Sequence, residues 1–119
     1  MPLTIKNEYG TITIENEVIA RIAGMAAIGC YGIVGMAAKN IKDGLVQLLK
    51  MESLTKGIHL KISNSSIVID LHIIVEYGTN IAAIADSIVS TVKYRVEENI
   101  GFPVAEVNIF VEDVRVENY

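Results

Sequence analysis

The spacing of the apolar residues changes once in the middle of this chain, and that change constrains the fold more than any other feature. From Gly57 to Glu76 aliphatic residues recur at every second position, as they do in a β-strand with one buried face. After Tyr77 and Gly78 they recur at every third or fourth position as far as Gly101, which is typical of an amphipathic helix. We therefore expect a β-hairpin that leads directly into a long helix.

The pattern of the hairpin also predicts its register. A two-residue turn at Asn64 and Ser65 places Ile62 opposite Ile67, and the pairing continues outwards in steps of two. The other pairs of this register are Leu60 with Ile69 and Ile58 with Leu71. The aliphatic side chains of both strands then share one face, and a slip of one residue would move one strand's set to the opposite face.

The helix that follows has clear boundaries. Asn80 is expected to cap its first turn, and Gly101 suits the left-handed position after its last turn. Pro103 then prevents the helix from continuing. The predicted buried seam of this helix consists of Ile81, Ile84, Ala85, Ile88, Val92 and Val96.

A final strand follows this helix. Val107, Ile109 and Val111 share one face, whereas Val114 and Val116 have the opposite parity. This change of phase around Glu112 predicts a β-bulge or the end of the sheet, since one extra residue in a strand reverses the alternation.

The first half of the chain carries weaker signals. Tyr9 to Glu15 alternates and predicts a strand, after which Asn16 is expected to cap a helix that ends near Gly29. Cys30 to Gly35 is expected to be irregular or briefly extended. Apolar residues at helical spacing then predict a short extra helix around residues 39–50.

The order of these elements indicates the fold class. With 119 residues and no linker or low-complexity segment, residues 1–119 are expected to form a single domain. Apart from the short extra helix, the order is βαββαβ, which matches the plan of two split βαβ units. We therefore expect an α+β domain with an antiparallel sheet and its two main helices on one face of that sheet.

Charge and segment composition exclude several classes of protein. Fourteen acidic and ten basic side chains leave a net charge of −4, which disfavours nucleic acid as a partner because a negative surface does not attract phosphates. The uncharged segment from Ile22 to Ala38 contains four glycines and is shorter than the roughly 20 apolar residues of a membrane span, so we expect no transmembrane segment. A single cysteine, Cys30, and the lack of a signal-peptide pattern favour a cytoplasmic location.

Two histidines and an aspartate are the first candidates for chemistry. The predicted register places His59 opposite Asp70, with His72 two residues along on the same face. Two imidazoles and a carboxylate on one surface resemble the ligand set of some iron and zinc sites. The alternative is a polar stripe that faces solvent, because side chains placed diagonally on a flat strand pair do not readily converge on one ion. We adopt the polar stripe and assign no metal ligand.

The other motifs are explained by packing. To act as a nucleophile, Cys30 would need a nearby histidine and a positive field, and both histidines lie on the hairpin. Gly29, Gly32 and Gly35 form two overlapping G-x-x-G patterns, but they lack the basic residues of a loop that clamps nucleic acid. Turns and close packing account for these glycines. No residue is therefore predicted to be catalytic or to bind a cofactor.

Several blocks of the sequence, taken together, resemble a known family. They are Gly10–Ala23, Gly32–Gly35, Val68–Leu71, Val75–Gly78, Ile84–Asp86, Val96–Glu97, Ile100–Gly101 and Val107–Val111. The set looks like the alkaline shock protein family of Gram-positive bacteria, also described as envelope stress response proteins, and the resemblance covers the chain from about Tyr9 to Val116. Its motifs are alternating hydrophobic residues, turn glycines and helix caps, so no functional residue is carried over from the family.

The resemblance implies a small cytosolic protein without catalytic activity. It also implies a role in cell-envelope homeostasis and stress tolerance through protein partners near the membrane. We therefore expect a non-enzymatic protein-interaction domain that forms homo-oligomers and needs no cofactor. Two apolar sets outside the predicted core, Val68 with Ile74 and Val114 with Val116, suggest a patch for a partner or for strand addition.

Two other classes of function stay open from the sequence. The first is a small-molecule-binding or regulatory module linked to envelope lipid metabolism, with a cleft between the first helix and the loop from Cys30 to Met36. The second is a metalloenzyme that uses His59, Asp70 and His72.

Overall fold

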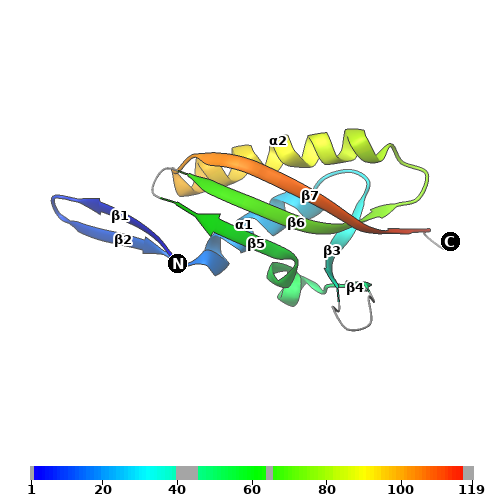
Figure 1. Cartoon of the computed structure of the whole chain (residues 1–119), viewed down its shortest axis with the longest axis horizontal. Helices are drawn as coiled ribbons and strands as arrows, with labels where there is room; N and C mark the ends of the chain where they lie inside the picture. Colours follow the sequence, from blue (N-terminus) through cyan, green and yellow to red (C-terminus); the bar gives the residue numbers. More distant parts are fainter. Residues whose placement is uncertain (1, 40–45, 64–65, 117–119) are drawn as a thin grey trace.

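The computed structural model describes residues 2–39, 46–63 and 66–116, which form an α+β domain (Figure 1). Its elements, in chain order, are β1 (Leu3–Asn7), β2 (Gly10–Ile14), α1 (Asn16–Ile28), β3 (Ile33–Lys39), β4 (Val46–Leu48), the 3₁₀ helix η1 (Met51–Gly57), β5 (Ile58–Ile62), β6 (Ile67–Glu76), α2 (Ile81–Ile100) and β7 (Val104–Arg115).

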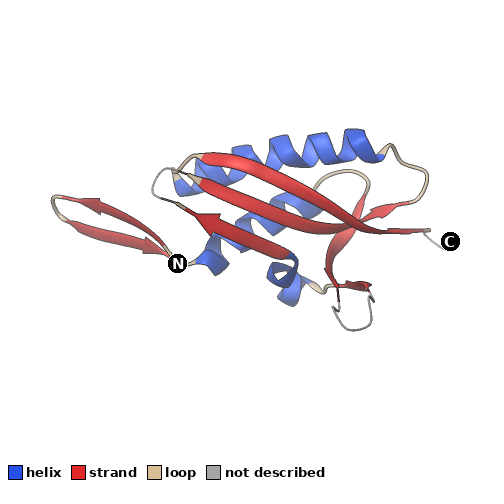
Figure 2. Ribbon diagram, in the orientation of Figure 1, coloured by secondary structure: helices blue, strands red, loops and turns tan. Residues whose placement is uncertain are grey.

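The main sheet is built around β6. Strand β7 pairs with one side of β6 in the parallel sense along its whole length. On the other side, β5 pairs with the first half of β6 and β3 with the second half, both antiparallel, and β4 extends the sheet beyond β3. Both long helices cover the same face of this sheet, which leaves what we call the open face on the other side (Figure 2).

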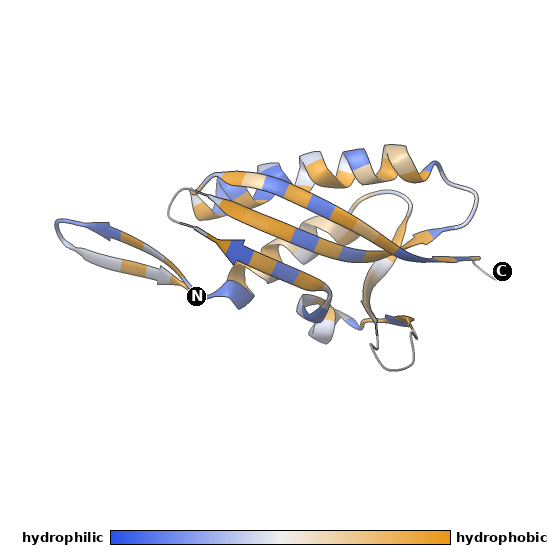
Figure 3. Ribbon diagram, in the orientation of Figure 1, coloured by the Kyte–Doolittle hydropathy of each residue, from blue (hydrophilic) through white to orange (hydrophobic). Residues whose placement is uncertain are grey.

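The hydrophobic core lies between the sheet and the two helices. Alternation of apolar and polar residues along β5, β6 and β7 directs one set of side chains inwards (Figure 3). The fully buried core residues of β6 are Ile67, Ile69, Leu71, Ile73 and Val75. The helices cover them with Ile19, Ala23, Ala27, Ile84, Ile88, Val92 and Val96.

The hairpin and the long helix have the predicted structure. Strands β5 and β6 pair Ile62 with Ile67, and the rest of the predicted register follows. The turn at residues 64 and 65 lies outside the described residues. In α2, the Asn80 side chain accepts a hydrogen bond from the Ala83 N–H at 3.1 Å, and Gly101 ends the helix with a left-handed φ of 77°. Two residues of the predicted seam are not buried, since Ile81 is exposed and Ala85 is half-buried.

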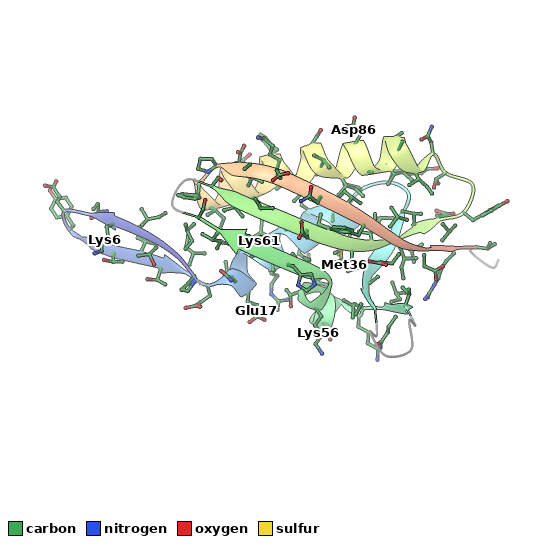
Figure 4. All side chains as sticks on the ribbon, viewed as in Figure 1. Lys6, Glu17, Met36, Lys56, Lys61 and Asp86 are labelled. Atoms are coloured by element: carbon green, nitrogen blue, oxygen red, sulfur yellow. The ribbon has the colours of Figure 1, made fainter. Side chains whose placement is uncertain are left out.

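The sheet is mixed, whereas the sequence predicted an antiparallel one. In the split βαβ plan, the strand before the first helix inserts between the two strands that flank the second helix. Here that strand, β2, pairs with β1 instead, in a separate hairpin that projects away from the sheet and carries Lys6 (Figure 4). Strand β7 therefore lies directly beside β6, and because α2 returns the chain across the sheet, the two strands run parallel.

Two other local predictions were wrong. The short extra helix predicted around residues 39–50 is not present in its described part, where β3 ends at Lys39 and pairs with β4. Helix α1 includes Asn16 rather than starting after it. Its first turn follows Glu15, and the Asn16 side-chain oxygen is buried without a hydrogen-bond partner.

Strand β7 contains two bulges. Its register against β6 skips Ala105 near the start and Glu112 near the end. The second bulge confirms the change of phase predicted around Glu112. It reverses the face of the sheet to which each later side chain of β7 points.

Candidate functional site

The open face of the sheet gathers the side chains that the sequence put forward for chemistry. Alternate residues of each strand point to this face, because their neighbours point into the core. On β5, β6 and β7 they include His59, Lys61, Val68, Asp70, His72, Asn108 and Phe110. The predicted pairing of His59 with Asp70 is present in the register of β5 and β6.

His72 lies at the centre of the contacts on this face. Its Nδ1 is 2.6 Å from Oε2 of Glu112, and the two side chains are only 24% and 16% exposed. The ring of His59 meets the His72 ring edge-on, with 5.2 Å between their centroids, and Phe110 stacks on the other side at 4.8 Å. These contacts form a continuous row of three rings from β5 to β7.

Asp70 has a different partner. Its Oδ1 accepts a hydrogen bond from Nδ2 of Asn108 at 2.9 Å, so the carboxylate is held by β7 rather than by either histidine. The structure therefore brings His59 against His72 but does not bring all three predicted residues to one point. In residues 2–39, 46–63 and 66–116, no group of three His, Cys, Asp or Glu side chains is arranged to hold a metal ion.

Cys30 and the nearby glycines take part in packing. The Cys30 thiol is half-buried and donates a hydrogen bond to the carbonyl oxygen of Ala26 at 3.5 Å. Gly32 has a positive φ of 88°, which favours glycine, and a Cβ there would collide with the Ile84 side chain. A Cβ on Gly35 would approach the Leu48 side chain to 2.8 Å. The close packing predicted for these two glycines is present.

The outer edge of β7 is a second candidate for function. This strand of 12 residues pairs with β6, and no other strand in the described part of the chain pairs with it. Apolar side chains on this strand and on the residue directly after it stay in contact with solvent, a set that we call the β7 edge surface. These are Phe110, Val111, Val114 and Val116, with exposed fractions of 45%, 37%, 40% and 67%.

The structure changes the composition of the predicted apolar patch. Val114 and Val116 are exposed, as that prediction requires, but Ile74 is fully buried and Val68 is half-buried. Leu48 reaches over Gly35, which is paired with Ile74, so the β3–β4 end of the sheet shields this position. Phe110 and Val111 take their place. The alternation along β7 could have identified Phe110, which has the opposite parity to the core residues, whereas Val111 shares the parity of Val107 and Ile109.

A groove between the two long helices is the third candidate. It has a volume of about 840 Å³ and lies on the side of α1 and α2 away from the sheet. Its apolar lining comes from α1 and includes Val18, Ile22 and Met25, of which Val18 and Met25 are about half exposed. Charged side chains of both signs also line it, namely Arg21, Arg95, Glu15 and Glu17, and Arg21 forms an ion pair with Glu17 at 3.4 Å. Cys30 reaches it, but the rest of the loop to Met36 does not line it, so the cleft differs in place from the one expected from the sequence.

Within the described residues, neither helix is long and apolar enough to cross a membrane. The uncharged segment from Ile22 to Ala38 is divided between α1 and β3.

Comparison with known proteins places these features in a family context. A model of the alkaline shock protein 23 family, described as having a cell envelope-related function, matches residues 4–116. The chain is 49% identical over 119 residues to the uncharacterized protein YloU of Bacillus subtilis (strain 168), with 99% of each chain covered. It is 32% identical over 117 residues to the uncharacterized protein Spy1614 of Streptococcus pyogenes serotype M6, covering 98% of this chain and 97% of that protein.

A longer relative and a solved structure are also similar. A stress response regulator gls24 homolog of Streptococcus pyogenes serotype M3 is 32% identical over 109 residues, which are 89% of this chain and 59% of that protein. Among solved structures, the MamM-CTD variant H264A has a TM-score of 0.51 at 13% sequence identity, covering 87% of this chain and all of that one. At this identity the likeness concerns the fold alone.

Proposed function

Because this chain belongs to the alkaline shock protein 23 family, whose function is cell envelope-related, we propose that it is a non-enzymatic domain that serves the envelope by binding proteins. The family resemblance drawn from the sequence is thereby confirmed. A role in the stress response is part of the proposal, supported by the name of the gls24 homologs, although this chain spans only 59% of their length. We place the protein in the cytoplasm, where it reaches the membrane through a partner.

The β7 edge surface is the observation that carries this proposal. A long strand at the edge of a sheet presents backbone N–H and C=O groups that can pair with a strand of another chain. Here the same edge carries four exposed apolar side chains, whose burial would favour association. The histidines, in contrast, are engaged by Glu112 and by the neighbouring rings.

Replacing Val114 by aspartate is expected to reduce the capture of envelope proteins about tenfold or more. A carboxylate at this position would have to lose its hydration when a partner covers the edge, and each 1.4 kcal/mol of that cost is about tenfold in affinity. We would tag the protein in its native cell, capture its partners from membrane and soluble fractions separately, and compare their amounts by mass spectrometry.

Val18→Asp is the matched control for that experiment. Val18 is also an exposed valine, 48% accessible, but it lies on α1, away from the β7 edge surface. This variant is expected to capture the same proteins as the wild type. If both variants lost their partners equally, or if Val114→Asp captured them normally, the β7 edge surface would not be the binding site.

The groove between α1 and α2 favours a second candidate function, the binding of a small molecule. Its apolar lining, beside side chains of both charges, suits a small amphipathic molecule, which fits a regulatory role in the envelope. Native mass spectrometry of the protein purified from its own cell would then show a bound small molecule. That mass should be absent in Val18→Asp and present in Val114→Asp; a wild-type protein with only its own mass would contradict this second function.

A further inference from the structure

We propose that β7 pairs in the antiparallel sense with β7 of a second copy of this chain, about a two-fold axis beside Phe110. The inference rests on the proposed function, since it names one occupant for the β7 edge surface. A two-fold axis presents the same strand from both copies, and the sheets of the two copies would become continuous.

The backbone of β7 shows which residues face the open edge. At its start, the Val104 N–H donates to Oε2 of Glu97 and the Val104 carbonyl accepts from Nζ of Lys93, so both groups point away from β6. At its end, the Arg115 carbonyl accepts from the Tyr77 N–H, on the β6 side. Along a strand, the N–H and C=O groups of successive residues point alternately towards β6 and towards the open edge. Each bulge adds one residue that is left out of this alternation. The residues that turn both backbone groups to the open edge are Val107, Ile109, Val111 and Val114.

An axis beside Phe110 pairs these residues with one another. Ile109 lies opposite Val111 of the second copy. The extra residue at the second bulge, Glu112, is left unpaired, so Val107 lies opposite Val114 of the second copy. In both pairs the N–H and C=O groups of the two residues face each other, as a hydrogen-bonded antiparallel pair requires. The Val114 N–H donates to Oδ1 of Asp113 at 2.8 Å in the single chain, and the pairing would exchange this exposed bond for one to the second copy. The pairing would also cover Val111 and Val114, which are two of the exposed apolar residues on this strand.

The charges along β7 agree with this register. The next pair outwards places Glu106 opposite Arg115 of the second copy, and the two-fold axis forms this pair of opposite charges twice. An axis beside Ile109, with the same extra residue passed over, would place Glu106 opposite Asp113 of the second copy, and like charges directly opposite destabilise a strand pair. An axis at Val114 would use only the last residues of the strand. Charge complementarity therefore favours the axis beside Phe110.

The row of rings on the open face also points to this axis. His59, His72 and Phe110 are in contact in that order across β5, β6 and β7, and the row stops at the edge of the sheet with Phe110 45% exposed. A two-fold axis beside Phe110 brings the same residue of the second copy against it. The row would then continue across the dimer, and Phe110 would gain an aromatic neighbour on its free side.

A disulfide cross-link tests the register directly. In a Cys30→Ser background, Phe110→Cys is expected to give a covalent dimer on mild oxidation. In a non-hydrogen-bonded antiparallel pair the two Cα atoms lie about 4.5 Å apart, within the range of a disulfide. Val114→Cys, in the same background, is the matched control at the same edge, and its two copies would be too far apart to link. Linking at Val114 without linking at Phe110 would overturn this register.

Exchange of the charged pair tests whether the contact exists in solution. Glu106→Arg and Arg115→Glu are each expected to weaken self-association about tenfold or more in analytical ultracentrifugation, and the double variant is expected to restore it. A wild-type protein that stays monomeric up to about 1 mM would overturn the pairing. If such a monomer still lost its envelope partners on Val114→Asp, the self-pairing alone would be wrong and the proposed function would stand.

Discussion

Replacing Ile69 by alanine is expected to lower the free energy of unfolding by about 2–5 kcal/mol. Ile69 lies at the centre of β6 with no exposed surface, between Leu60 on one side and Val107 on the other. Removal of its outer carbons takes away buried apolar surface and leaves a cavity, because strands on both sides prevent the site from collapsing. Urea unfolding followed by circular dichroism measures the loss.

Ile12→Ala is the matched control, since it makes the same chemical change in a strand that lies outside the main sheet. Ile12 is on the projecting β1–β2 hairpin and is 52% exposed. Its replacement is expected to cost less than about 1 kcal/mol, because much of its surface already contacts water. Equal losses in the two variants would show that β6 is not the centre of the core.

Replacing Gly57 by alanine is expected to lower the free energy of unfolding by about 1–3 kcal/mol, although only one methyl group is added. A Cβ at Gly57 would lie 2.7 Å from the carbonyl oxygen of Ala37 and 3.3 Å from the Leu49 side chain. Ala37 is a fully buried residue of β3, so its backbone can give way only if the strand itself shifts. The same urea experiment measures the effect.

Gly29→Ala provides the control for that substitution. Gly29 follows α1 with a φ of −78°, which any residue adopts, and the atoms nearest to a Cβ there are 3.6 Å away. This substitution is expected to change the free energy of unfolding by less than about 1 kcal/mol. We expect an increase, because alanine restricts the conformations of the unfolded chain. A loss at Gly29 as large as that at Gly57 would contradict the close approach of η1 to β3.

The second half of the chain could be predicted from its sequence in some detail. The register of β5 with β6, the cap at Asn80, the left-handed Gly101 and the bulge at Glu112 are all present. Each of these features depends on residues that are close in sequence, such as the two arms of a hairpin or the first turn of a helix. Alternation and capping therefore contained the necessary information.

The first half was predicted less well for a physical reason. The alternation from Tyr9 to Glu15 correctly indicated a strand but could not show whether that strand joins the main sheet. The uncharged residues after Gly32 suited a loop, a helix or a strand, and pairing with Val75, Ile74 and Ile73 makes them a strand. Both outcomes depend on contacts between residues far apart in the chain.

The candidate site shows the same division. The sequence placed His59, Asp70 and His72 on one face, and the structure confirms that placement. Their partners Glu112, Asn108 and Phe110 come from β7, some forty positions further along the chain. No local pattern shows that β7 lies beside β6, so neither these contacts nor the β7 edge surface could be found in full from the sequence.

The sequence by itself determined the α+β class, the hairpin that leads into a long helix, and the family. It could do so because hydrophobic periodicity, helix caps and turn residues act over a few positions. Only the tertiary structure decided that β2 leaves the sheet and that β7 pairs with β6 in parallel. That choice is made by the packing of the whole chain, because a strand takes whichever neighbour buries its apolar face and satisfies its backbone groups. The same choice leaves the outer edge of β7 open to a partner.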